Sequence, residues 1–198
     1  MTTTDTAPLL SADFLREKFN AALAYHDYAS TGNNNQQAAW RAVYDAASLT
    51  PQQTGLLQSF TREINILVSS GVWCGDCVQQ CPLLARIAEA NPDKVHLRFV
   101  DRDEHADLAN RIRICAGLRV PTAIFMAEDF EFISLLGDKT LTRYRILAEQ
   151  SLGPACPLPG APVPPDERAA VLHDWLNEVE RSHILCRLSA RLRQIHND

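Results

Sequence analysis

Three of the six cysteines fall within eight residues, at positions 74, 77 and 81. The segment Trp73-Cys74-Gly75-Asp76-Cys77 follows an apolar run and precedes a helical pattern, so Cys74 is expected at a helix N-terminus. Backbone N–H groups and the helix dipole stabilise an anion there, which predicts that Cys74 forms a thiolate more readily than a free cysteine. The spacing lets Cys77 reach the first sulfur from one turn inside the helix. The pair is therefore predicted to perform thiol–disulfide exchange, with Cys74 attacking and Cys77 resolving the mixed disulfide.

A Cys-x-x-Cys pair also occurs in metal sites, so two other functions stay open from the residues alone. Cys74, Cys77 and Cys81 could offer soft thiolate ligands to Zn or Cu(I), with a histidine or a substrate as the fourth ligand. The chain has no second paired-ligand motif, which makes this alternative weaker, and we assign no metal. The other alternative is a non-catalytic interaction protein, with the helices at both ends of the chain as its working surface.

The remaining cysteines have no neighbouring motif. Cys81 is expected to be a small buried apolar residue one turn beyond Cys77. Cys115 is predicted to face the core from a helix that is capped by Asp103 and stops at Gly117. Cys156 and Cys186 lie in a proline-rich connector and on the last helix, and we assign them no role.

The elements that must position the cysteines are visible in the hydrophobic pattern. Residues 63–69 and 95–101 predict strands, and a helix over about 74–90 joins them. Two short strands, 123–126 and 130–136, form a hairpin, and a helix over about 140–149 follows. The first pair of strands must be parallel with a right-handed crossover, while the hairpin adds an antiparallel edge.

Helices precede and follow this part of the chain. Ser11 caps a predicted helix that carries Leu23 on its inner face, and further helices are expected over 36–48 and from Pro51 to about Phe60. Residues 152–165 hold six of the eleven prolines and form a connector to a last helix. Trp40 and Trp175 are expected to be packing anchors for these added helices. The predicted organisation is a helical extension over 1–61, an α/β core over 62–150, and a connector with a C-terminal helix over 151–198.

The core resembles the thioredoxin family over about residues 62–140. Besides the Trp-Cys-Gly-Asp-Cys motif, Pro82 stands five residues after the second cysteine, as in the family's active-site helix. Val120-Pro121-Thr122 precedes a strand, as the family's cis-proline loop does, and Gly137 after the hairpin agrees as well. The resemblance implies an α/β, thioredoxin-like fold: a central mixed four-stranded sheet flanked by helices, here with an N-terminal helical extension and a C-terminal helix.

The resemblance also implies a function. A thiol–disulfide oxidoreductase is expected to reduce disulfides of a client protein or a small molecule through Cys74 and Cys77. Trp73, Val120, Pro121 and Thr122 would position the substrate, and Gly75 and Asp76 would tune the redox couple. The chain has no Gly-x-Gly-x-x-Gly turn for a nucleotide cofactor, so we assign no cofactor. Electrons are expected from an external thiol reductant such as an enzyme of the thioredoxin-reductase type.

Two departures from the family bear on chemistry. Asp76 stands where the family has a proline, and residues 71–81 contain no Lys, Arg or His to counter its charge. A nearby negative charge disfavours the thiolate, so a reducing couple is expected. Val68 and Leu97 stand where the family has a buried Asp and a buried Lys. The resolving step at Cys77 therefore lacks its usual carboxylate.

Composition limits the other classes of function. The chain has 198 residues, 46% of them apolar, and a net charge of −5, which gives no overall electrostatic case for nucleic-acid binding. No apolar run approaches the about 18 residues of a membrane span. The N-terminus lacks the basic and apolar stretches of a secretory signal, so a cytoplasmic protein with cysteines resting as thiols is expected.

Overall fold

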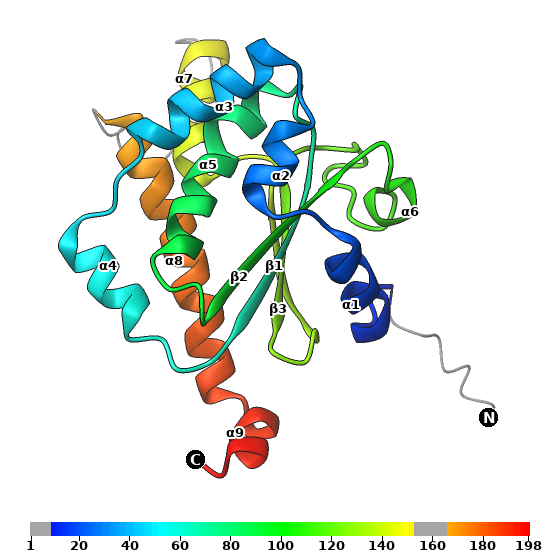
Figure 1. Cartoon of the computed structure of the whole chain (residues 1–198), viewed down its shortest axis with the longest axis vertical. Coiled ribbons are helices and arrows are strands. Elements are labelled where there is room, and N and C mark those ends of the chain that lie inside the picture. The colour runs from blue at the N-terminus through cyan, green and yellow to red at the C-terminus, as the bar shows by residue number, and fades with distance from the viewer. Residues whose placement is uncertain (1–8, 153–165) are drawn as a thin grey trace.

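The computed structural model describes residues 9–152 and 166–198 (Figure 1). The strands are β1 (Ile64–Ser70), β2 (Val95–Asp101), β3 (Thr122–Ala127) and β4 (Phe132–Gly137). The helices before β1 are α1 (Ala12–Ala21), α2 (Tyr25–Ser30), α3 (Asn34–Ala46) and α4 (Pro51–Gln58). Those after it are α5 (Gly75–Glu89), α6 (Ala106–Ala109), α7 (Leu141–Leu152), α8 (Glu167–Leu188) and α9 (Ala190–His196).

The four strands form one mixed sheet in the order β2-β1-β3-β4. β1 runs parallel to β2, with Ile64 opposite Val95 and Ser70 opposite Asp101. β3 is antiparallel to both β1 and β4. The α5 crossover and the hairpin at the other edge are those that the hydrophobic pattern predicts.

Helices cover both faces of the sheet. On one face, Ile66 and Val68 of β1 and Phe125 of β3 belong to a core that includes α5 and α8. On the other face, the intervening residues Leu67 and Ile124 pack with apolar side chains of α1 and α6. Alternation along each strand thus sends successive residues to opposite cores. Figure 1 shows α3 lying over α5 on the first face, where the two helices are in contact.

The added helices are anchored by two tryptophans, as predicted. Trp40 of α3 is fully buried, and its indole N–H donates to the carbonyl oxygen of Val72 at 3.0 Å. Trp175 of α8 is fully buried in the same core. Since Val72 lies two residues before Cys74, α3 supports the loop that carries the first cysteine. Asp166 caps α8 by accepting from the Ala169 N–H at 3.0 Å. Cys156 lies outside the described residues.

The first predicted helix is too long. α1 ends at Ala21, and Leu23 is extended and pairs with the edge of β2. Its N–H donates to the carbonyl of Phe99 at 2.9 Å, and the Phe99 N–H donates back at 2.8 Å. These bonds to an open sheet edge replace the helical ones, so Leu23 is 41% exposed instead of lying in the core.

The helix predicted up to Gly117 is also wrong. α6 spans only Ala106–Ala109, and the chain then turns through Cys115 and Ala116, which have φ angles of 49° and 61°. Paired backbone bonds between Ile114 and Gly117 close this turn. Cys115 is therefore exposed, and its predicted place in the core is a misassignment.

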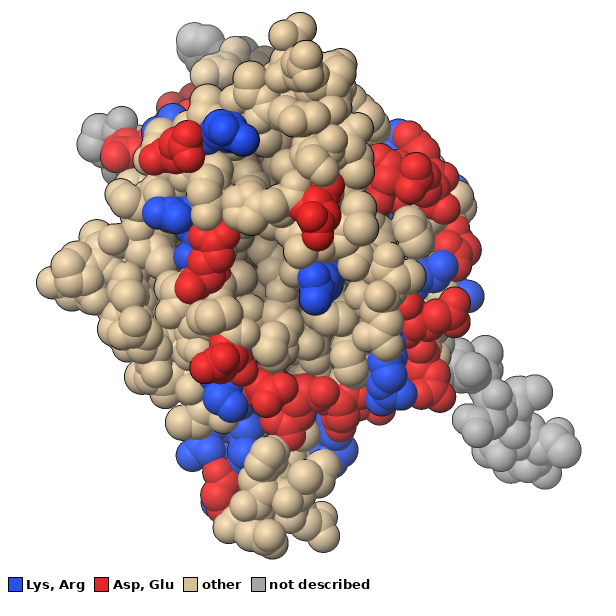
Figure 2. Space-filling view, in the orientation of Figure 1, with Lys and Arg blue, Asp and Glu red and all other residues tan. Residues whose placement is uncertain are grey.

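The surface carries charges of both signs. On the face shown in Figure 2, acidic and basic side chains lie interspersed along the lower half. None of the helices in the described ranges combines the length and the apolar character that crossing a membrane requires.

Candidate active site

Cys74 is the N-cap residue of α5, with φ −86° and ψ 125°, as the sequence predicts. Its backbone N–H donates to the carbonyl of Gly71 at 2.9 Å, and its own carbonyl accepts from the Val78 N–H at 3.0 Å. The Cys74 side chain is half-buried, whereas Cys77, in the first turn, is fully buried. Only the first sulfur of the pair is therefore open to a substrate.

The predicted proline loop lies against Cys74. The Val120–Pro121 peptide bond is cis, as the resemblance implies. The Cys74 thiol donates to the carbonyl oxygen of Val120 at 3.8 Å. Thr122 is buried and donates its hydroxyl to the carbonyl of Arg119 at 2.9 Å. Gly137 makes this packing possible, because a Cβ there would lie 2.5 Å from the carbonyl oxygen of Pro121.

Trp73 lies beside the pair and is 49% exposed. The guanidinium of Arg102 lies 4.8 Å from the centroid of its ring, a cation–π distance that orients the indole. Gly71 leaves room for the ring, since a Cβ there would lie 2.7 Å from it. An exposed aromatic face next to a half-exposed sulfur offers apolar contact area to an incoming molecule.

The two thiols affect each other's ionisation. The hydrogen bond with Cys77 and then burial raise the pKa of Cys74, and the backbone N–H groups of Cys77 and Asp76 oppose this. Burial also raises the pKa of Cys77. The partner thiol and the lost solvent thus oppose the easy ionisation of Cys74 that its place at a helix N-terminus predicts.

Comparison with known proteins identifies the family. A family model described as Thioredoxin matches residues 22–140, more than half of the chain. The chain belongs to the thioredoxin family. The match begins within the predicted N-terminal extension, at the segment that pairs with the edge of β2.

Two solved structures share the fold over most of this chain. A protein of unknown function from Pseudomonas aeruginosa is 18% identical with a TM-score of 0.65, covering 84% of this chain and 95% of its own. An HIV epitope-scaffold is 18% identical with a TM-score of 0.58, and the match covers 85% of this chain and 92% of the scaffold. The oxidised mitochondrial thioredoxin 3 of Saccharomyces cerevisiae is 23% identical with a TM-score of 0.32, covering 48% and 86%. No curated protein matches the chain.

Beneath the cysteine pair, the chain departs from the thioredoxin pattern as its sequence indicates. Val68 is fully buried in β1, where the family has a carboxylate. Cys81 is fully buried one turn beyond Cys77, as expected, with its sulfur 3.7 Å from the hydroxyl oxygen of Ser70. Across residues 9–152 and 166–198, no three His, Cys, Asp or Glu side chains are arranged to hold a metal ion. The metal-site alternative with Cys74, Cys77 and Cys81 therefore finds no support.

Asp76 is not the isolated charge that the neighbouring sequence indicates. The Lys139 ammonium lies 2.8 Å from one oxygen of its carboxylate, and Arg143 Nε lies 3.8 Å from the other. Both basic residues come from the segment after β4, more than sixty positions along the chain. The premise that nothing counters the charge of Asp76 is wrong, because the compensating cations lie outside residues 71–81 and reach Asp76 only in the folded chain. Gly75 begins α5 and has open space at its Cα.

A charged cluster that the sequence analysis missed surrounds Asp138. Its buried carboxylate accepts from Lys139 at 2.7 Å, from Arg119 at 3.2 Å, and from the Tyr144 hydroxyl. Burial alone would raise the pKa of Asp138, but the bonds from Lys139 and Tyr144 outweigh it, and the pKa falls to about 2. Gln80 of α5 joins the cluster by donating to the Asp138 carbonyl at 2.9 Å. No local pattern marks these residues, since β4 brings them to α5 only in the folded chain.

Proposed function

We propose that this protein is a thiol–disulfide oxidoreductase that reduces disulfides through the Cys74/Cys77 dithiol. The observation that carries the proposal is the placement of Cys74: half-exposed, at the N-terminus of α5, and in contact with the carbonyl before Pro121. Cys77 lies one turn behind it, out of solvent. This arrangement admits a substrate disulfide to one sulfur and keeps the other for the second step.

The reaction begins when the Cys74 thiolate attacks a substrate disulfide. A bond forms between Cys74 Sγ and one substrate sulfur, the substrate disulfide breaks, and the other substrate sulfur leaves as a thiolate that takes up a proton. The Cys77 sulfur, after losing its proton, then attacks Cys74 Sγ and releases the second substrate thiol. Two electrons have passed to the substrate, and the enzyme holds a Cys74–Cys77 disulfide.

The surroundings favour a reductant over an oxidant. The hydrogen bond with Cys77 and burial raise the pKa of Cys74, and burial raises the pKa of Cys77, so the thiolate of the reduced form is poorly stabilised. A less stabilised reduced form corresponds to a more reducing couple. We expect an external dithiol, from a thioredoxin-reductase-type enzyme, to regenerate the pair in a reducing compartment such as the cytoplasm.

Turbidity from insulin reduction in the presence of dithiothreitol tests this function. The wild-type protein should accelerate the reaction, and Cys74→Ser should abolish the acceleration. Cys77→Ser should attack once and stall as a mixed disulfide on Cys74, visible by mass spectrometry. Cys115→Ser is the matched control, because Cys115 is exposed but lies outside the pair, and it should retain full activity. No acceleration by the wild-type protein would favour the non-catalytic interaction protein, and acceleration by Cys74→Ser equal to that of wild type would refute Cys74 as the attacking residue.

A further inference from the structure

A second hollow in the molecule shares no residue with the redox pair or its proline loop. It lies between α2 and α3, has a volume of about 300 Å³, and is open to solvent. This volume is at the lower end of the range typical of small-molecule sites. The added N-terminal helices thus enclose a pocket that the redox reaction does not use.

One wall of the pocket is aromatic. The rings of Tyr25 and Tyr44 stack, with centroids 5.2 Å apart and an interplanar angle of 20°. His26 meets both rings edge-on, at 5.1 and 5.3 Å. Ala29, on α2, leaves room between this wall and the rest of the lining. A planar apolar group can therefore lie against the wall.

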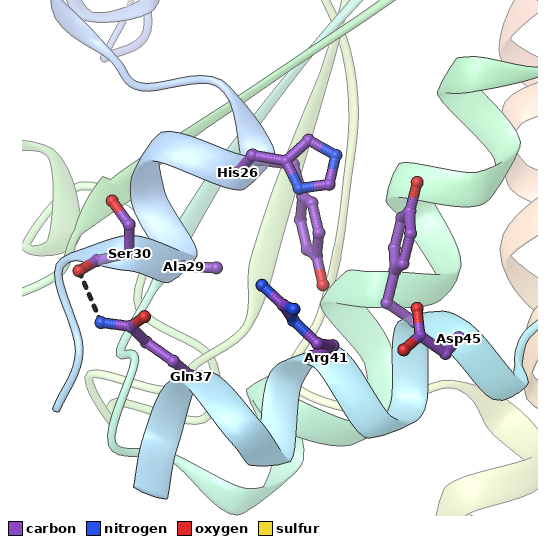
Figure 3. A pocket seen from close by; sticks show the side chains of 8 residues that line it. His26, Ala29, Ser30, Gln37, Arg41 and Asp45 are labelled. Carbon is purple, nitrogen blue, oxygen red and sulfur yellow. Dashed lines mark hydrogen bonds between the residues drawn. The ribbon is translucent and has the colours of Figure 1, made fainter. Parts of the chain in front are cut away.

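Two opposite charges line the same pocket and do not pair with each other. Arg41 and Asp45 are one turn apart on α3, a spacing at which such residues often form an ion pair. Neither has an ion-pair or hydrogen-bond partner among the side chains of residues 9–152 and 166–198. Figure 3 shows Arg41 reaching from α3 toward the space below His26, while Asp45 lies farther along the helix. Gln37, by contrast, is held by bonds to the carbonyls of Ser30 and Gly32 at 3.0 and 2.7 Å.

One tyrosine of this wall is itself buried. Tyr25 is 8% exposed, and its hydroxyl, which has no hydrogen-bond partner in the described chain, is closed off from solvent. A ligand in the pocket therefore meets the Tyr25 ring and not its hydroxyl. Arg41 offers a planar fork of N–H donors that matches the two oxygens of a carboxylate. Asp45 offers an acceptor for an ammonium group.

We infer that this pocket binds a small zwitterion with a planar apolar body, of the chemical class of an aromatic α-amino acid. Its carboxylate would accept from Arg41, its ammonium would donate to Asp45, and its ring would lie against the tyrosines. The site is independent of the disulfide chemistry, so either can fail without the other.

Titration of the ¹⁵N-labelled protein, followed by amide chemical shifts, tests the site with three probes. L-Phenylalanine carries both charges, 3-phenylpropanoate lacks the ammonium, and phenethylamine lacks the carboxylate. Phenylalanine should give saturable shifts in residues of α2 and α3, and each analogue should bind about tenfold or more weakly, because one charged hydrogen bond is lost. Absence of saturable shifts in these helices, or equal binding of 3-phenylpropanoate, would overturn the inference.

Variants assign the two charges. Arg41→Gln should weaken phenylalanine and 3-phenylpropanoate about tenfold and leave phenethylamine unchanged, whereas Asp45→Asn should weaken phenylalanine and phenethylamine. Both residues are exposed on a helix, so the fold should persist, and dispersed amide spectra would verify it. Arg98→Gln removes another exposed arginine, outside the pocket, and should bind like wild type. Unchanged phenylalanine affinity in Arg41→Gln would exclude the proposed carboxylate site.

Discussion

Asp138 is expected to make the stability of the protein fall in acid. Its carboxylate is 5% exposed and is held by Lys139, Arg119 and Tyr144 beside the redox pair. The pKa drops from 3.8 to about 2, and each pKa unit is worth about 1.4 kcal/mol, so the charged form contributes about 2.5 kcal/mol to the free energy of unfolding. Because the folded pKa lies below the unfolded one, this contribution is present above 3.8 and is lost as the pH falls through about 2.

Urea unfolding of wild type and Asp138→Asn at about pH 7 and about pH 3 measures this contribution. The amide carries no charge, so the variant should be less stable by about 2.5 kcal/mol at the higher pH. At about pH 3 the unfolded carboxyl is mostly protonated, and the difference should shrink by about 1 kcal/mol. Asp93→Asn, at an exposed position, is the control and should show a small, constant difference. A difference for Asp138→Asn that is the same at both pH values would refute the reasoning.

Three further outcomes are expected. Lys139→Met and Asp76→Asn together should destabilise the protein less than the sum of their separate effects, because the two charged groups lie 2.8 Å apart. A double-mutant cycle in urea should give a coupling free energy of about 1 kcal/mol, and strict additivity would contradict the ion pair. The rate of iodoacetamide labelling of Cys74, measured by mass spectrometry, should keep rising from about pH 7 to about pH 9, because the bond with Cys77 and burial raise its pKa. A rate that levels off near about pH 7 would contradict this. Burial lowers the pKa of His183, whose ring accepts from the backbone N–H groups of residues 61 and 62. The free energy of unfolding should therefore fall as the pH drops below about 6.5, and urea unfolding of His183→Gln should lack this decrease.

Local signals sufficed where neighbours in the sequence decide a residue's structure. The Ser11 side chain accepts from the Phe14 N–H at 3.4 Å and so caps its helix, as predicted. Cys74 begins its helix as expected, and the apolar pattern of residues 63–69 predicts the buried strand that lies at Ile64–Ser70. The order of strands follows from a parallel crossover plus a hairpin, because few topologies satisfy both.

Contacts between distant segments explain what the sequence did not predict. Leu23 lies outside the helix because its backbone pairs with Phe99 at the edge of β2. The spacing of apolar residues near Leu23 gives no information about a sheet edge that is distant in the sequence. Asp76 meets Lys139 because β4 ends beside α5. This pair changes the reason for a reducing couple, since the charge of Asp76 is compensated. The burial of both thiols, which raises the pKa of each, now carries that expectation.

The reduction potential of the Cys74/Cys77 couple is the sharpest test of a disulfide reductase. The wild-type protein is equilibrated in glutathione buffers of graded ratio, free thiols are alkylated, and mass spectrometry measures the fraction with a Cys74–Cys77 disulfide. We predict that this disulfide forms with a midpoint nearer about −270 mV than about −120 mV. A midpoint above about −180 mV, or no Cys74–Cys77 disulfide at any ratio, would contradict a disulfide reductase.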